Sequence, residues 1–104
     1  MTRPFIALYR WRVEPEHDAA FRQEWRSVTL AMREAGALGS CLTTASDGTF
    51  AAIALWPSED ARAAAFAANS HIVMSVPATR LEELRLTVED DLWIGSPFAQ
   101  MVDR

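Results

Sequence analysis

The chain has 104 residues, 50% hydrophobic and 23% charged, which is enough for one globular domain with one modest core. Its formal net charge is −4, and the ten basic residues are spread along the chain. This excludes the basic stripe that proteins use to bind nucleic acid or anionic lipid.

The N-terminal residues and the single cysteine bear on location. Cys41 has no partner for an internal disulfide, which fits a reducing compartment. In "MTRPFIALYRWRVEPEH" the apolar run is broken by Arg10 and Arg12 and no small-residue cleavage site follows, so a secretory signal is not expected. No segment approaches the ~18 apolar residues of a membrane span. We therefore expect a cytoplasmic protein without a membrane segment.

The first two predicted elements are a strand and a helix. Residues 5–13 predict a strand, because aromatic and branched side chains alternate along it: Phe5, Ala7, Tyr9, Trp11 and Val13 share one side. From residue 16 the apolar residues recur at helical spacing, at Phe21, Trp25, Val28, Met32 and Ala35. Gly36 is the expected end of this helix, since glycine suits a left-handed C-cap.

A hairpin, a second helix and a last strand are predicted next. Two β-compatible runs flank Asp47-Gly48, which predicts a hairpin with a type I′ turn, in which both central residues have positive φ. Ser58 is the expected N-cap of a helix that continues through an alanine-rich stretch. Residues 69–77 are ambiguous and compatible with a further short helix. Residues 84–93 alternate in polarity and predict the last strand.

This order of elements predicts an α+β, ferredoxin-like fold, with a four-stranded antiparallel sheet and its helices on one face. Residues 1–104 are expected to form a single domain, with a core of about residues 4–93 and a C-terminal tail at 94–104.

The strand at residues 50–56 is apolar on both sides, and two helices cover only one face of such a sheet. Ala51, Ile53 and Leu55 share one side, and Phe50, Ala52, Ala54 and Trp56 share the other. A partner that covers about 800 Å² per subunit would give a gross gain of about 25 kcal/mol, above the ~4–15 kcal/mol that association costs. We expect a homodimer joined through the sheet faces. The alternative is that residues 94–104 fold back over that face.

Three stretches of the chain resemble the antibiotic biosynthesis monooxygenase (ABM) family. They are "FIALYRWRVEPEHDAAFRQEWRSVTLAMREAGALGS", "DGTFAAIALWPSEDA" and "EDDLW", and the resemblance spans about residues 4–93. It implies a ferredoxin-like subunit whose sheet pairs with that of a second copy to form a dimeric α/β barrel.

The resemblance also implies a range of chemistry. Some members oxidise polycyclic aromatic precursors to quinones with dioxygen and no cofactor, and others bind and degrade haem. The leading expectation is cofactor-independent oxidation of a small aromatic substrate in an apolar cavity, with no cofactor and no metal. The alternatives are a non-catalytic dimeric module that binds a small ligand or is purely structural, and, third, haem binding.

Trp56 matches the tryptophan that lines the substrate cavity of oxidising members, at the end of the third strand. Its indole N–H is suited to a ligand carbonyl while its ring stacks on an aromatic; the other interpretation is a core tryptophan. The assisting asparagine is absent from "AAIAL", and "FIALYRWRV" lacks the asparagine of the haem degraders. Tyr9, Trp11 and Trp25 are expected to line the same pocket, unless they only pack the core.

The remaining candidates are polar. His71 is the one histidine to consider as a catalytic base or a haem ligand. It lies far from His17 in the sequence, and the spacing matches no histidine metal motif, so no metal site is expected. Arg10 and Arg12 are expected to pair with acidic residues or, alternatively, to bind an anionic group of the substrate. Cys41 is expected to be a small buried side chain.

Overall fold

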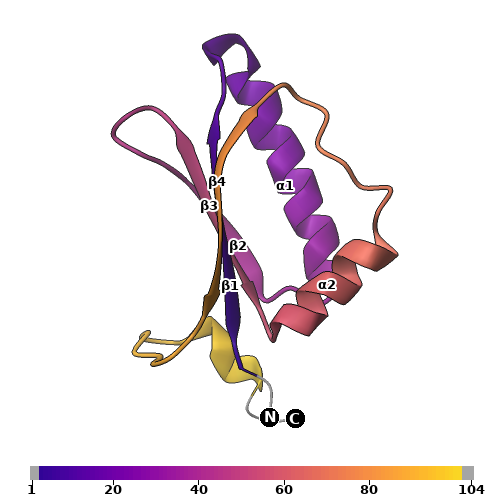
Figure 1. The fold of residues 1–104 in the computed structure, drawn as a ribbon, viewed down its shortest axis with the longest axis vertical. Helices are drawn as coiled ribbons and strands as arrows, with labels where there is room; N and C mark the ends of the chain where they lie inside the picture. Colours follow the sequence, from indigo (N-terminus) through magenta and orange to yellow (C-terminus); the bar gives the residue numbers. More distant parts are fainter. Residues whose placement is uncertain (1–2, 102–104) are drawn as a thin grey trace.

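The computed structural model describes residues 3–101, and its elements confirm the predicted α+β architecture. The order is β1 (Phe5–Arg12), α1 (Asp18–Glu34), β2 (Gly39–Thr44), β3 (Phe50–Trp56), α2 (Glu59–Ala68) and β4 (Thr79–Thr87), with 3-10 turns at Pro15–His17 and Pro97–Met101. The strands form one antiparallel sheet in the order β2-β3-β1-β4. Both helices cover the same face of this sheet (Figure 1).

The core lies between that face and the helices, and it follows from the alternation along β1. Phe5, Ala7 and Trp11 are buried, and the partly buried Tyr9 packs on the same face. Phe21 of α1 is fully buried, with its ring 5.3 Å from that of Trp11 and 5.0 Å from that of Phe50. The predicted apolar face of the first helix therefore packs on the sheet, and the helix ends before Gly36, which has φ 115°.

The hairpin between β2 and β3 forms where it was predicted, but its turn type was predicted wrongly. Only Gly48 has a positive φ (86°), so Asp47 does not take the conformation that a type I′ turn requires. The Gly48 amide donates to Ala45 O (3.0 Å) and the Ala45 amide donates to Thr49 O (2.8 Å), as in a longer loop with a glycine at its end. The Thr49 hydroxyl and amide, helped by Arg10, hold the pKa of Asp47 below its ordinary value. The side chain of Asp47 thus stabilises the alternative turn.

Helix α2 begins as expected, since the amide of Ala61 donates to the Ser58 hydroxyl oxygen at 3.0 Å. Replacing Ser58 with alanine should lower the free energy of unfolding by about 1 kcal/mol, because one amide of the first turn loses its acceptor. Urea denaturation followed by circular dichroism measures this change. Ser46→Ala in the exposed hairpin loop is the control. Equal midpoints for Ser58→Ala and the wild type would show that the cap contributes nothing.

The last strand lies earlier in the chain than predicted. β4 spans Thr79–Thr87, residues 88–93 are outside it, and residues 69–78 form no helix. Its first half is rich in charged residues and shows no apolar alternation, so only its pairing with β1 defines it as a strand.

A one-residue irregularity in β4 determines which of its side chains face the helices. Arg10 of β1 pairs with Glu82, whereas the next residue, Trp11, pairs with Arg80, so Leu81 is an extra residue in the ladder. Without this bulge, Arg80 and Glu83 would lie on opposite faces, since they are three residues apart. With it, Arg80 pairs with Trp11 and Glu83 pairs with Tyr9, so both lie on the face that the helices cover.

The face of the sheet away from the helices, here called the outer face, is largely apolar. Its register brings together Ile6, Leu8, Ile53, Leu84 and Leu86. Leu84 is 41% exposed and Leu86 is 39% exposed. Cys41 lies opposite Ile53 and is exposed, so its predicted burial was wrong, because the edge strand β2 turns this side chain away from the helices.

The C-terminal tail covers part of the outer face. The 3-10 turn Pro97–Met101 contacts β3, where Phe98 and the outward-facing Leu55 are both buried. Within residues 3–101, the tail thus shields the β3 end of this face and leaves Leu84 and Leu86 exposed. None of the helices in this described part has the length and apolar character of a membrane span.

Candidate functional site: a cavity between the sheet and the helices

A cavity of about 670 Å³ lies between the helix-covered face of the sheet, the two helices and the segment 69–78. Small side chains on the strands leave this room: Ala52 and Ala54 of β3 both line it. Helix α2 is rich in alanine, so its side chains fill little of the space between the helix and the sheet. The volume falls within the range of small-molecule sites.

Aromatic side chains form much of the cavity wall. Tyr9 and Trp11 stack with ring centroids 5.6 Å apart, and Trp25 lines the cavity from α1. At the other side, the rings of Trp56 and Phe66 meet edge to face at 5.9 Å. A planar aromatic ligand would find surfaces for stacking on both sides.

Trp56 carries an unusual polar atom. Its side chain is 2% exposed, and its indole Nε1 has no hydrogen-bond partner within the described residues. Buried tryptophan N–H groups normally have an acceptor, and leaving one without a partner costs about 1–3 kcal/mol. The atom itself is closed off from the cavity, so a ligand oxygen supplies the missing acceptor only after a small shift of the neighbouring side chains.

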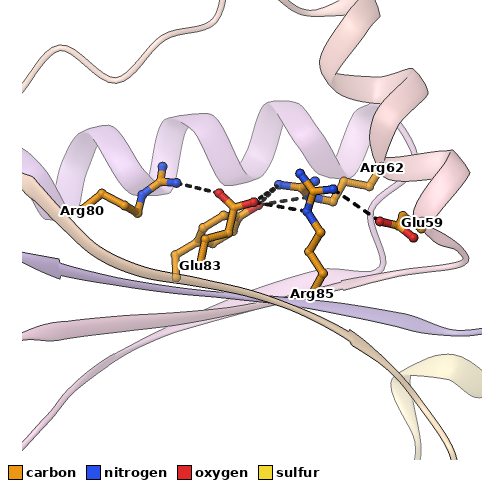
Figure 2. A network of polar contacts seen from close by, with 6 residues as sticks. Glu59, Arg62, Arg80, Glu83 and Arg85 are labelled. Carbon is orange, nitrogen blue, oxygen red and sulfur yellow. Dashed lines mark hydrogen bonds and ion pairs between the residues drawn. The ribbon is translucent and has the colours of Figure 1, made fainter.

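One end of the cavity is charged. Figure 2 shows Glu83 of β4 between Arg80 on one side and Arg62 and Arg85 on the other, and these four side chains line the cavity. The Glu83 carboxylate lies 2.8 Å from Arg80, 3.4 Å from Arg85 and 3.6 Å from Arg62. Glu59 completes this charged cluster through an ion pair with Arg85 at 3.5 Å.

Arg62 is the buried member of the charged cluster, with a side chain 9% exposed. Its Nε and Nη2 both donate to the Tyr9 hydroxyl oxygen, at 3.1 and 2.5 Å. Its guanidinium lies over the Phe66 ring, 4.5 Å from the centroid. These contacts hold the guanidinium in one orientation at the cavity wall.

Helix α1 fixes the segment 69–78, which closes one side of the cavity. The Glu24 carboxylate accepts hydrogen bonds from the amides of Ser75 and Val76, both at 2.8 Å, and from the Ser75 hydroxyl at 2.7 Å. The Val76 amide, followed by the Ser75 amide and hydroxyl, lowers the pKa of Glu24 from its ordinary value of 4.5. These bonds add to the packing of Ile72, Met74 and Val76 against the core and tie the segment to the helix.

We expect the amide proton shifts of Ser75 and Val76 to titrate with a midpoint below pH 4.5. A carboxyl whose pKa is lowered on folding contributes stability above its unfolded pKa and loses it as pH falls through the folded value. NMR spectra recorded from pH 7 to 3 measure the midpoint, with Glu24→Gln as the variant that should lack the step. A midpoint at or above 4.5 would contradict these contacts.

The cavity brings together four of the residues predicted for it: Tyr9, Trp11, Trp25 and Trp56. His71 is exposed and is not among the lining residues. The described residues contain no group of three or more His, Cys, Asp or Glu side chains able to hold a metal ion.

The two arginines predicted as alternative anion binders lie elsewhere. Arg10 forms ion pairs with Asp47 at 3.2 Å and Glu82 at 3.7 Å, and Arg12 is exposed. Arg10 thus has the acidic partners that the pairing interpretation predicts.

Other lining residues do not stand out in the sequence. Arg62 lies in an alanine-rich helix and resembles a solvated residue there. Asn69 lines the cavity from the end of α2 and donates its Nδ2 to Ala65 O at 2.8 Å. Its Oδ1 accepts no hydrogen bond from the described residues, so it remains an acceptor for a ligand.

Several solved structures resemble this one. The cofactor-independent oxygenase SnoaB from Streptomyces nogalater covers 88% of this chain, and 98% of its own length is matched, with 20% identity and a TM-score of 0.66. The chain has an ABM-like fold. The match to Rv0793 from Mycobacterium tuberculosis covers 86% of this chain and 99% of the Rv0793 chain, with 16% identity and a TM-score of 0.64.

A third structure with the ABM-like fold is NE2512, a protein of unknown function from Nitrosomonas europaea. It is 20% identical, the match covers 89% of this chain and 96% of the NE2512 chain, and the TM-score is 0.56. No protein-family model and no curated protein sequence matches the chain. At these identities the likeness establishes the fold, while activity must be argued from the cavity.

Proposed function

We propose that this protein is a cofactor-independent monooxygenase that oxidises a small planar aromatic ketone in the cavity. The observation that carries the proposal is the buried indole N–H of Trp56, which lacks an acceptor among the described residues and lines an aromatic-walled cavity. The ABM-like fold, shared with the cofactor-independent oxygenase SnoaB, supports it.

In the proposed reaction, the Trp56 N–H donates to the carbonyl oxygen of the substrate. Negative charge develops on that oxygen as the neighbouring ring system loses a methylene proton to solvent, and a donor fixed in a dry wall stabilises this charge. The carbanion then reduces dioxygen. One oxygen atom becomes the new carbonyl of a quinone, and the other leaves as water with the two methylene hydrogens.

An anthrone, a tricyclic ketone with one methylene carbon, tests the proposal. We expect the protein to accelerate oxygen uptake, measured with an oxygen electrode, and to form one quinone per dioxygen consumed, measured by absorbance. Heat-denatured protein gives the uncatalysed rate. Equal rates with native and denatured protein would refute a monooxygenase role for this substrate class.

A non-catalytic ligand-binding module is the second candidate, and the charged cluster favours it. Among the described lining residues, Glu83 is the only carboxylate, and three guanidinium groups surround it. Its oxygens are already engaged in ion pairs with these groups, so it is a poor candidate for the base that a catalytic site would need. Binding of aromatic ketones without oxygen uptake would favour this second role. Haem binding is not proposed, because His71 does not line the cavity.

We also propose that two copies of the chain associate through their outer faces. A standard interface covers about 800 Å² per subunit, a small part of the 6884 Å² surface of the chain. Ile6, Leu8, Ile53, Leu84 and Leu86 supply an apolar centre for it, and the tail covers only the β3 end of this face. A second copy offers the same apolar surface, as a two-fold interface requires.

A further inference from the structure

We propose that the charged end of the cavity binds a carboxylate, so that the preferred substrate is an aromatic acid. The inference rests on the proposed function and deepens it, because it names the second group that the ligand carries. The group that binds the carboxylate is the guanidinium of Arg62, assisted by Arg80 and by the hydroxyl of Tyr9.

The charge balance of the cluster supports an anionic ligand. Arg62, Arg80 and Arg85 contribute three positive charges, and Glu59 and Glu83 contribute two negative charges. One positive charge is therefore left over beside the cavity. A partly buried charge is stabilised best by an opposite charge within hydrogen-bonding distance, and a ligand carboxylate supplies one.

Arg62 has donors to offer. The distance from its Nη2 to the Glu83 carboxylate, 3.6 Å, is too long for a hydrogen bond. Its Nε and Nη2 donate instead to the Tyr9 hydroxyl oxygen. Its Nη1 donates no hydrogen bond within the described residues. The side chain is nevertheless held in place by Tyr9 and Phe66, so a ligand gains a charged donor without having to order a mobile side chain.

Tyr9 adds a second donor at the same place. Its hydroxyl oxygen accepts from Arg62, and its hydroxyl proton is donated to no acceptor in the part of the chain that the structure describes. The guanidinium of Arg80 lies over the rings of Tyr9 and Trp11, at 5.0 and 5.5 Å from their centroids. Two cations and one hydroxyl thus surround the end of the aromatic wall.

The charged end and Trp56 belong to one continuous wall. Phe66 contacts the Trp56 ring on one side and the Arg62 guanidinium on the other. A planar ligand that lies along Phe66 therefore extends from the Trp56 ring toward the guanidinium. This arrangement favours a ring system with a carbonyl at one end and a carboxylate at the other.

The test compares 2-naphthoate with 2-naphthamide, which has the same ring system without the charge. Isothermal titration calorimetry measures both dissociation constants. We expect the acid to bind about 10- to 100-fold more tightly, the range expected for one hydrogen bond to a charged group. Arg62→Gln should abolish most of this preference, because it should weaken binding of the acid far more than binding of the amide. Arg12→Gln removes the same charge from an exposed position and should leave the preference intact.

The outcomes separate the two proposals. Equal affinities for acid and amide, or binding of neither compound, would overturn the carboxylate site. The proposed function is tested separately by oxygen uptake with the anthrone. If Arg12→Gln lost as much of the preference for the acid as Arg62→Gln does, the preference would arise from the net charge of the protein and not from Arg62. If circular dichroism shows that Arg62→Gln does not fold, Arg62→Lys replaces it, since lysine keeps the charge but lacks the two-donor geometry of the guanidinium. An unchanged preference for the acid in Arg62→Lys would contradict the role of the guanidinium.

Discussion

Replacing Trp56 with phenylalanine should lower kcat for anthrone oxidation by about 100- to 1,000-fold, the effect of removing one donor from an oxyanion site. Phenylalanine keeps most of the aromatic wall, so KM should change much less than kcat. The variant should fold, because the lost N–H has no partner among the described residues and its removal breaks no hydrogen bond there. Stopped-flow absorbance of the quinone measures both constants.

Trp93→Phe is the matched control, since Trp93 is 56% exposed and does not line the cavity. It should retain the wild-type kcat. A Trp56→Phe variant with a kcat within about threefold of the wild type would contradict the role of the indole N–H, because such a change corresponds to less than ~1 kcal/mol of transition-state stabilisation.

Replacing Leu84 with aspartate should convert the proposed dimer to a monomer. A two-fold interface through the outer faces would bury two copies of the new carboxylate, and each unpaired buried charge costs about 3–5 kcal/mol. The dissociation constant should therefore rise by about 1,000-fold or more. Size-exclusion chromatography with light scattering should give 11.6 kDa for this variant and twice that mass for the wild type.

Leu30→Asp provides the same chemical change on the solvent side of α1. Leu30 is 44% exposed, close to the 41% of Leu84, but it belongs to the helix layer and not to the outer face. This control should remain a dimer. A wild-type chain that elutes at 11.6 kDa at micromolar concentration would contradict the dimer itself, and a dimeric Leu84→Asp would place the interface elsewhere.

The parts of the fold that depend on local pattern could be predicted from the sequence. The apolar spacing from Phe21 to Met32 specifies α1, and the alternation along β1 specifies which side chains meet it. The prediction of the turn type was wrong because the side chain of Asp47 accepts hydrogen bonds from Thr49, an interaction that dipeptide preferences do not include. The predicted start of β4 was wrong because the charged residues there form a strand only by pairing with β1.

The same distinction explains the candidate site. Tyr9 and Trp11 alternate along β1 and Trp56 ends β3, so the face of the sheet that they share could be predicted. The charged end could not, because Arg62 is buried by contact with Tyr9, 53 residues away. The bulge at Leu81, which brings Arg80 and Glu83 to the same face, has no signal in the sequence that we could identify.

The most direct test of a ligand site at Trp56 is the indole N–H signal of that residue. The chain has four tryptophans, and ¹H–¹⁵N spectra resolve their indole signals, which Trp→Phe variants assign. Titration with chromone, a planar bicyclic ketone, should shift the Trp56 signal downfield as it acquires an acceptor, while the signal of the exposed Trp93 stays in place. A Trp56 signal that does not move at saturating chromone would contradict the proposal that this N–H binds the carbonyl of the substrate.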